Sequence, residues 1–517
     1  MIMQRTGFAI FVILPVLLAV GCGPSGPSGP SGVSAVIVEP DEVELVVGEH
    51  HQLDATVDAA GNASEEVTWS SDDASVATVN EAGHVSAVAE GSATVTATSV
   101  ADPSIADDVR VEVFVEGALR WTKLVETHMV DEIGAIAVDG ADDVLVGGAT
   151  AGDMGDATAG ALGGGGGGEA ALDAYVRKLD AGGDEVWTHQ FGTSHEDEVA
   201  RAGLATDGEN AVLVGATVGG PVGTHVGGQD ALLRKLDATG EVVWTRQFGT
   251  SDADNVRSVA VGREDAVVVA GETRGDVAAV NAGQTDVYVR KFDADGTTLW
   301  TRQFGSGTFD GVWGVAVDAT GHVFVAGDTN GALAGPSAGG WDLWVRRLDP
   351  DGTTLWTRQF GTPANEYVSG IAVDPNGHVL LTGSTEGTLG ASHAGGSDVF
   401  VRRLHPEGTH LWTRQFGTAA SEVAGGVATD SEEHVIVVGG TQGDLAGHAG
   451  GEDGFVRKMD AEGEEVWRRQ FGSEVEEVAT GVAVDGKDWI LVATQVSGTL
   501  ASPLSGQGHG VVSAYMR

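Results

Sequence analysis

The chain has 517 residues, 42% of them apolar, which is enough for several domains with packed cores. Its formal net charge of -47 argues against nucleic acid and anionic lipid surfaces as partners, because both would be repelled. The same charge permits a cationic partner or a divalent metal, and its simplest role is to keep an exported protein soluble. A single cysteine excludes disulfides within the chain, so the domains must be stabilised by packing.

Residues 1–21 have the pattern of a lipoprotein signal peptide. Arg5 precedes an apolar run from Gly7 to Ala19, which is too short to span a membrane. Small residues then lead to Cys22 and resemble a lipobox, although an ordinary signal peptide with a chance cysteine would look similar. We expect lipidation of Cys22, which would anchor the protein stably if more than one acyl chain is attached. No aspartate follows Cys22, so we expect an outer-membrane or cell-surface lipoprotein.

Residues 22–32 and 33–116 follow as a linker and a small β domain. The linker repeats Gly-Pro-Ser three times, which predicts an extended, semi-rigid spacer. In the next segment, Ala93 to Thr98 alternates small apolar residues with threonines, and turns rich in Gly, Asn and Asp separate similar short runs. This pattern predicts an antiparallel sandwich. Val67-Thr68-Trp69-Ser70-Ser71 and Gly91 to Ala97 resemble the second group of bacterial Ig-like domains, which implies a spacer or adhesive module.

Residues 117–517 consist of repeats. Tryptophan recurs at intervals of about 56 residues, and most of these tryptophans begin a Trp-x-Arg-Gln-Phe-Gly motif. The repeated tryptophans are Trp121, Trp187, Trp244, Trp300, Trp356, Trp412 and Trp467. Each period holds four short apolar segments separated by Gly and Asp turns, which is typical of a propeller blade. Within the Trp segment, the Arg and Phe share the face of the Trp, so we interpret the trio as blade-to-blade packing.

The two ends of the repeat array predict its closure. The array starts with an unpaired Trp segment, Leu119 to Val125, and ends with Gly510 to Arg517, with no Trp segment after it. The first segment therefore supplies the missing strand of the last blade, which gives seven complete blades and no free edge. The predicted fold is all-β: an Ig-like sandwich followed by a seven-bladed β-propeller, closed by pairing of its N-terminal strand with its C-terminal strand.

The repeats resemble a known family. Val345 to Asp349, Trp356 to Gly361 and Ile371 to Val379 are similar to the bacterial β-propeller repeat called SBBP, whose members are expected at the bacterial surface and whose biochemical role is mostly undefined. Leu236 to Trp244 also resembles the docking motif of pyrroloquinoline-quinone propellers, but only the turn and the tryptophan match. That second resemblance leaves open an envelope-assembly subunit of the quinone-propeller type.

One acidic position recurs just after a Gly-rich turn in six periods. Its members are Asp173, Asp230, Asp286, Asp342, Asp398 and Asp453. These carboxylates either fix their loops, by accepting backbone amides or pairing an arginine, or form a channel ring that binds a cation. Asp-rich turns such as Asp349 to Gly352 faintly resemble a calcium loop but lack the distal glutamate. We expect no cofactor, with calcium the one ion to consider.

No catalytic motif is apparent in the sequence. We therefore expect a non-enzymatic lipoprotein for recognition, adhesion or scaffolding, held to the membrane through Cys22, that binds a protein or a glycan through one face of the propeller and does not bind nucleic acid. The alternatives are the envelope-assembly subunit and a propeller hydrolase or lyase with carboxylates converging at the channel mouth.

Overall fold

The computed structural model describes residues 32–517 except 126–130, 153, 155–171, 194, 221–226, 391, 448–449 and 498–508. The predicted signal peptide, Cys22 and the Gly-Pro-Ser linker to residue 31 lie outside the described residues. The chain divides into two compact units, Met1–Phe114 and Val115–Arg517. Described secondary structure is β apart from one short 3-10 turn, Arg263–Asp265. None of the helical structure among the described residues has the length and apolarity that a membrane crossing requires.

The first unit is an Ig-like sandwich. One sheet has the order β2 (Glu42–Val46), β9 (Ala106–Phe114), β8 (Gly91–Ser99), β5 (Val67–Ser71). The others are β3 (His50–Gln52), β7 (His84–Ala87), β6 (Ala77–Val79), and the pair β1 (Gly32–Glu39) with β4 (Asp54–Ala60). The alternation in β8 buries Ala93, Val95 and Ala97, which pack against Val109 and Val111 of β9. The predicted alternation of core-facing and outward-facing residues is therefore observed in this core.

The second unit consists of four-stranded antiparallel sheets, each named here by its innermost strand. The first three are β11 (Asp131–Val138), β12 (Val144–Thr150), β13 (Asp173–Leu179), β14 (Glu185–Phe191); β15 (Asp197–Thr206), β16 (Val212–Val218), β17 (Asp230–Leu236), β18 (Val242–Phe248); and β19 (Asp254–Val261), β20 (Val267–Thr273), β21 (Asp286–Phe292), β22 (Thr298–Phe304). A single parallel bridge, Ala202 to Ser258, joins the β15 and β19 sheets.

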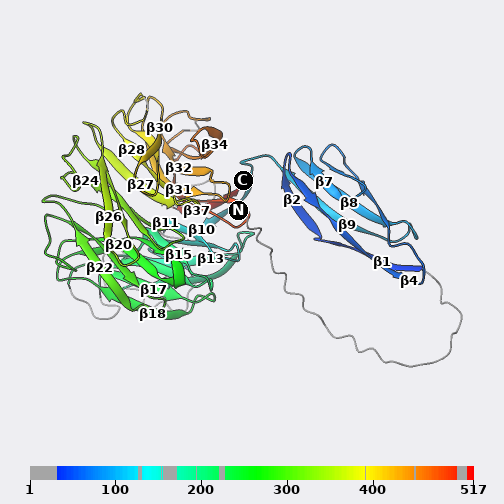
Figure 1. Cartoon of the computed structure of the whole chain (residues 1–517), viewed down its shortest axis with the longest axis horizontal. Helices are drawn as coiled ribbons and strands as arrows, with labels where there is room; N and C mark the ends of the chain where they lie inside the picture. The colour runs from blue at the N-terminus through cyan, green and yellow to red at the C-terminus, as the bar shows by residue number, and fades with distance from the viewer. Residues whose placement is uncertain are drawn as a thin grey trace. The chain divides into compact units, whose positions relative to one another are not determined.

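Three further sheets repeat the same order. They are β23 (Gly314–Val317), β24 (Val323–Thr329), β25 (Asp342–Leu348), β26 (Thr354–Phe360); β27 (Glu366–Val373), β28 (Val379–Thr385), β29 (Asp398–Leu404), β30 (His410–Phe416); and β31 (Glu422–Thr429), β32 (Val435–Thr441), β33 (Asp453–Met459), β34 (Glu465–Phe471). Figure 1 shows β11, β15, β27 and β31 toward the middle of this unit and β18, β22, β30 and β34 at its periphery.

The last sheet joins the two ends of the unit. Its order is β35 (Glu476–Val484), β36 (Ile490–Ser497), β37 (His509–Tyr515), β10 (Leu119–Val125). β10 pairs antiparallel with β37, from Leu119 opposite Tyr515 to Val125 opposite Gly510, so the pairing predicted from the ends of the array is present. Neighbouring innermost strands pack against each other in chain order, and β35 also packs against β11.

Packing between successive sheets forms the core of the second unit. The second and third strands of a sheet are buried on both faces, as in β12 and β13. Their aliphatic side chains contact those of the next sheet, as Val268 and Val289 contact Val325 and Leu348 across the β19 and β23 sheets. These two strands are therefore rich in apolar residues, whereas the outermost strands expose residues such as Leu299 and Leu355.

Candidate functional site

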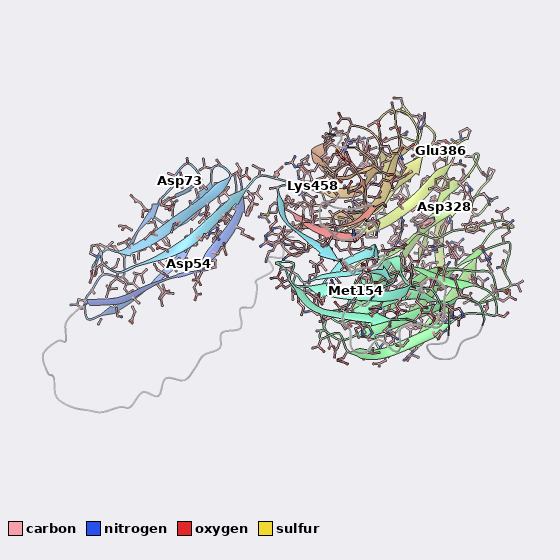
Figure 2. The ribbon with its side chains drawn as sticks, turned by 180° about the vertical axis from the view of Figure 1, so that it is seen from behind. Asp54, Asp73, Met154, Asp328, Glu386 and Lys458 are labelled. Carbon is pink, nitrogen blue, oxygen red and sulfur yellow. The ribbon has the colours of Figure 1, made fainter. Side chains whose placement is uncertain are left out.

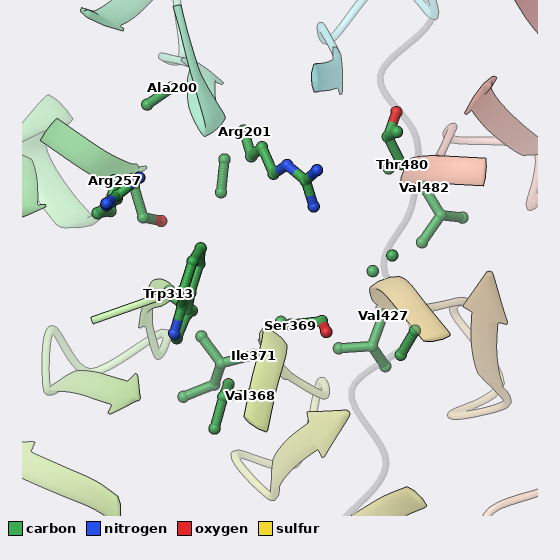
Figure 3. A pocket seen from close by; sticks show the side chains of 18 of the residues that line it. Ala200, Arg201, Arg257, Trp313, Val368, Ser369, Ile371, Val427, Thr480 and Val482 are labelled. Atoms are coloured by element: carbon green, nitrogen blue, oxygen red, sulfur yellow. The ribbon is translucent and has the colours of Figure 1, made fainter. Parts of the chain in front are cut away.

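A cavity of about 780 Å³ is lined mainly by the innermost strands of the second unit. Much of its wall is small or apolar, with Gly370, Gly426 and Val482 among the lining residues. Charged and aromatic groups gather on part of it, where Arg257 and Trp313 lie side by side at the wall (Figure 3). Function in a repeat protein is sought where the repeats differ, because a position shared by every repeat is explained by the common fold.

The β19 and β23 sheets carry buried acids at one repeat position on their second strands. Glu272 and Asp328 occupy the position that holds Thr217, Ser384 and Gln495 in other sheets. In most sheets this side chain accepts a backbone N–H from the next innermost strand. The hydrogen bonds are Val256 N to Thr217 Oγ1 (3.3 Å), Val312 N to Glu272 Oε1 (3.3 Å), Ala424 N to Ser384 Oγ (3.3 Å) and Ile133 N to Gln495 Oε1 (2.9 Å).

Asp328 and Glu272 are buried at 3% and 5% exposure and have different partners. The Trp313 indole N–H donates to Asp328 Oδ2 at 2.7 Å, and the Val368 backbone N–H also donates to this carboxylate. Burial nevertheless raises the pKa of Asp328 to about 7, with a smaller contribution from the nearby Glu272 charge. Glu272 instead forms an ion pair with Arg257, with Nη2 to Oε2 at 3.1 Å. The result is one titratable carboxyl beside one neutralised carboxylate.

Aromatic side chains cluster in the same sector. Arg257 lies over the Trp313 ring, 5.1 Å from its centroid. Phe309 and Trp341 make an edge contact with centroids 5.5 Å apart, and Trp341 lies 6.3 Å from Tyr367. Tyr367 is 39% exposed, and its pKa is raised by burial and by the charges of Glu386 and Asp328. Figure 2 shows Glu386 and Asp328 in one sector of the second unit.

This cluster is absent from corresponding positions of the other described sheets. Where the β23 sheet has Trp341, other sheets have Gln229, Thr285 and Ser397, which likewise stand just before the third strand. The cluster was not predicted from the sequence, because its residues do not recur from repeat to repeat. A position-by-position comparison of the periods would have shown that Phe309, Trp313, Trp341 and Tyr367 depart from the repeat.

The strand β15 differs from its counterparts by two extra residues. Its pairing with β16 is interrupted between Val199 and Leu204, and the inserted backbone places Arg201 on the cavity wall. The Arg201 side chain is exposed and points into the open middle of the cavity (Figure 3). Glu198 also lines the cavity, and its pKa is raised, first by desolvation and then by the Glu132 charge, although Arg257 and Arg201 oppose this shift.

The predicted tryptophans lie on the outermost strands, away from the cavity. The indole N–H of most donates to a carbonyl in a turn of the next sheet, at 2.9–3.2 Å; these are Trp121, Trp187, Trp244, Trp300, Trp356 and Trp412. Arg302 lies over Trp300 and donates from Nε to Gly352 O at 2.8 Å. Trp467 is 7% exposed, and no described residue accepts its indole N–H. These contacts dock one sheet on the next.

The six predicted aspartates begin the third strand of their sheets and accept hydrogen bonds from a glutamine of the Trp strand. The amide-to-carboxylate distances are 2.7–3.0 Å for Asp173, Asp230, Asp286, Asp342, Asp398 and Asp453. Loop amides also donate, for example Ala338 N to Asp342 Oδ2 at 2.8 Å. Arg346, four residues after Asp342, instead lies over the Phe304 ring, with its Cζ 3.6 Å from the ring centroid. None of the six aspartates is among the described residues that line the cavity.

One group of side chains has the spacing of a metal site. Asp374, His378 and Glu433 bring ligand atoms within 4.8 Å of one another. The Arg403 guanidinium already lies among them: Nη2 contacts Asp374, Glu433 Oε2 at 2.8 Å and His378 Nδ1 at 3.1 Å. A cation of the protein therefore neutralises this cluster, and it is a structural ion-pair network.

Comparison with known families supports the resemblances to the bacterial Ig-like domain and to the β-propeller repeat. Residues 32–106 match the bacterial Ig-like domain (group 2), and residues 355–390 match the β-propeller repeat. The two family assignments made from sequence are confirmed. The Ig-like domain indicates an extracellular or surface protein.

Curated relatives match only in part. Regulatory protein FlaEY of Caulobacter vibrioides is 30% identical over 177 residues, which are 31% of this chain and 18% of that protein. The 3-O-alpha-D-galactosyl-alpha-L-arabinofuranosidase of Bifidobacterium longum subsp. longum is 46% identical over 72 residues, 14% of this chain and 6% of the enzyme. The matches therefore span less than a fifth of either relative.

Similar solved structures include enzymes. Polysaccharide lyase Uly1 has a TM-score of 0.45 at 11% identity, covering 78% of this chain and all of the lyase. Puromycin hydrolase has a TM-score of 0.42 at 15% identity, covering 74% of this chain and 52% of the hydrolase. These matches overturn the expectation that the chain is not an enzyme, which had rested only on missing sequence motifs. At such identities and TM-scores they assign no reaction to this chain.

Proposed function

We propose that this chain, which carries a bacterial Ig-like domain of group 2 and a β-propeller repeat, is a surface lipoprotein that binds a glycan through a closed seven-bladed β-propeller. In this proposal, acylated Cys22 anchors the chain, and the Gly-Pro-Ser linker and the Ig-like unit separate the propeller from the membrane. The ligand would bind at the cavity sector formed by the β19, β23 and β27 sheets.

Contacts between the first and last sheets support closure of the ring. Besides the β10–β37 pairing, Ile133 N donates to Gln495 Oε1 at 2.9 Å, and Thr480 Oγ1 donates to Ile133 O at 3.0 Å. The first of these repeats the hydrogen bond that links successive sheets elsewhere, as between Thr217 and Val256. In a ring closed in this way, neither the first nor the last sheet leaves a broad apolar face exposed.

The single observation that carries the glycan proposal is the aromatic and acidic sector at the cavity, where Trp313, Tyr367 and Glu386 line the wall and the Trp341 ring lies 6.3 Å from that of Tyr367. Trp341 and Tyr367 offer ring faces for the apolar faces of sugars, and neighbouring polar groups offer hydrogen-bond partners for hydroxyls. Asn365 Nδ2 donates to Glu386 Oε2 at 2.8 Å beside Tyr367, which holds both side chains in place. Because these residues interrupt a regular repeat, the fold alone does not account for them.

Binding to a glycan array, followed by titration calorimetry with the best ligand, tests this proposal. We expect Tyr367→Ala and Trp341→Ala each to weaken binding by about tenfold or more, since losing a stacked aromatic ring costs on the order of 1–2 kcal/mol. Gln229→Ala is the matched control, because Gln229 occupies the position of Trp341 in the β15 sheet. Equal affinity of all these variants, or no glycan bound by the parent, would refute the proposal.

Cleavage of the bound glycan is the second candidate function. The observation that favours it is Asp328, which is buried behind the cavity wall, accepts a hydrogen bond from the lining residue Trp313 and has a pKa of about 7, a value suited to proton transfer near neutral pH. Incubating the protein with each bound glycan and measuring new reducing ends and unsaturated products tests this function. Product formation that is lost in Asp328→Asn while binding persists would support it, and an absence of products with every bound glycan would exclude it.

The anchor is tested separately, in intact cells. We expect Cys22→Ser to move the protein from the membrane fraction to the soluble fraction and to abolish its labelling by a fatty-acid probe. Added protease should degrade the parent protein on intact cells if the propeller faces outward. Retention of the variant in membranes, with unchanged labelling, would contradict lipidation at this residue.

A further inference from the structure

We propose that the glycan bound in the cavity carries an anionic group, a carboxylate or a sulfate, and that Arg201 binds this group inside the cavity. The inference rests on the proposed glycan-binding function and names the chemical class of the ligand.

The local backbone of β15 is the first observation. Most innermost strands have glycine at the position that Ser258 holds in β19: Gly314, Gly370, Gly426 and Gly481. β15 places Ala202 opposite Ser258 and Arg201 directly before it. Adjacent strands approach so closely there that a Cβ on Gly314 would lie 2.5 Å from the Ile371 side chain. The two extra residues of β15 interrupt its pairing with β16 and bring one long side chain, Arg201, to the cavity wall. That side chain is a cation.

The state of Arg201 is the second observation. Arg257, the other arginine of the cavity wall, is neutralised by Glu272 at 3.1 Å. Among the residues that the structure describes, none accepts a hydrogen bond from Arg201, and no carboxylate lies within 4.0 Å of its guanidinium. An arginine that projects into a cavity keeps its planar set of donors available for a carboxylate or a sulfate.

The charge of the whole chain makes such a site selective. With a formal net charge of -47, the protein repels polyanions in general. Binding of an acidic polymer therefore cannot arise from non-specific attraction and requires a local cationic site. Glu198 also lines the cavity wall, where its negative charge would oppose a bound anion; burial, followed by the Glu132 charge, raises its pKa.

Matched pairs of polymers test the inference in the full chain by titration calorimetry. Dextran and dextran sulfate differ in sulfate, and methyl-esterified pectin and polygalacturonate differ in free carboxylate, so each pair isolates one anion. We expect one charged member to bind at least tenfold more tightly than its neutral partner. Equal affinity within both pairs would overturn the inference, while binding of neutral glycans at Tyr367 would leave the proposed function intact.

Substitutions of Arg201 test whether this residue causes the preference for charged polymers. Arg201→Gln should reduce affinity for the charged polymer by about tenfold to a hundredfold, as expected for loss of a charge-assisted hydrogen bond, and Arg201→Lys should restore part of it. Glu198→Gln should strengthen binding. The matched control is Arg263→Gln, which removes the same charge from an exposed turn outside the cavity. A preference for the charged polymer that survives in Arg201→Gln would refute the assignment of the anion to Arg201.

Small anions separate this inference from the glycan proposal. Inorganic sulfate at millimolar concentration should bind the parent protein and fail to bind Arg201→Gln. If no polymer binds but sulfate binds through Arg201, the glycan function fails and the anion site stands. If sulfate does not bind the parent, and no charged polymer is preferred, the anion site is excluded.

Discussion

Replacing Asp328 with asparagine should change the pH dependence of stability in the second unit. The folded-state pKa of this buried carboxyl is about 7, against a usual value of 3.8. Because the folded protein holds this proton more tightly than the unfolded chain, the stabilising contribution is complete below pH 3.8 and is lost as the pH rises to about 7. The side-chain amide of the Asp328→Asn variant does not titrate, so a comparison of the two proteins isolates this one group.

The size of the effect follows from the shift. The contribution of Asp328 to the free energy of unfolding falls as the pH rises from 5 to the folded-state pKa of about 7 and changes little above it. This range of about two pH units corresponds to about 2.7 kcal/mol, at 1.36 kcal/mol per unit. A folded unit of about 400 residues has an unfolding entropy near 0.8 kcal/mol/K, so this free energy corresponds to about 3 °C in Tm. We expect the Tm of Asp328→Asn, relative to that of the parent, to be about 3 °C higher at pH 8 than at pH 5.

Thermal unfolding followed by tryptophan fluorescence measures this difference, because every tryptophan except Trp69 lies in the second unit. Ser384→Ala is the control: Ser384 accepts the equivalent backbone N–H, from Ala424, but does not titrate near neutral pH. Its effect on Tm should be the same at both pH values. A difference between Asp328→Asn and the parent that does not change from pH 5 to pH 8 would refute the assigned pKa.

Three further predictions concern the fold and are checked by thermal or denaturant unfolding. Deleting 510–517 removes most of the partner of both β10 and β36, so the whole second unit should lose its cooperative transition; an unchanged Tm would argue against a closed ring. Trp344→Ala should cost about 3–5 kcal/mol, more than Trp300→Ala, because Trp344 is fully buried and Trp300 is partly exposed. Gly361→Ala should cost about 1–3 kcal/mol, since its Cβ would lie 2.3 Å from Asp342 Oδ1 and 2.7 Å from Glu366 Oε2, whereas Gly307→Ala, with open space around it, should change stability by less than about 0.5 kcal/mol. Equal costs within either matched pair would contradict the packing described here.

The repeats were predictable because their local chemistry is strong. The spacing of the tryptophans defined the period, and the short apolar segments expected within each period are observed as strands, for example β24, Val323–Thr329, and β25, Asp342–Leu348. The pairing of β10 with β37 also followed from sequence, because an outer-strand segment at one end complements the missing one at the other.

The candidate site was not predictable in the same way. Arg257, Trp313 and Tyr367 lie on three different sheets, and they meet only because consecutive innermost strands surround one cavity. Residues that recur in most periods drew attention to Asp342 and Trp356, whose contacts hold loops and neighbouring sheets. The raised pKa of Asp328 depends on burial between two sheets, which no local sequence pattern reports.

Hydroxyl-radical footprinting with the bound glycan tests the central claim most directly, because it locates the ligand without any substitution. The account predicts that Trp313, Trp341 and Tyr367 become protected when the glycan binds, and that Pro375, which lines a separate pocket, keeps its reactivity. Protection of Pro375 with unchanged reactivity of Trp341 and Tyr367 would contradict a binding site in this sector of the cavity.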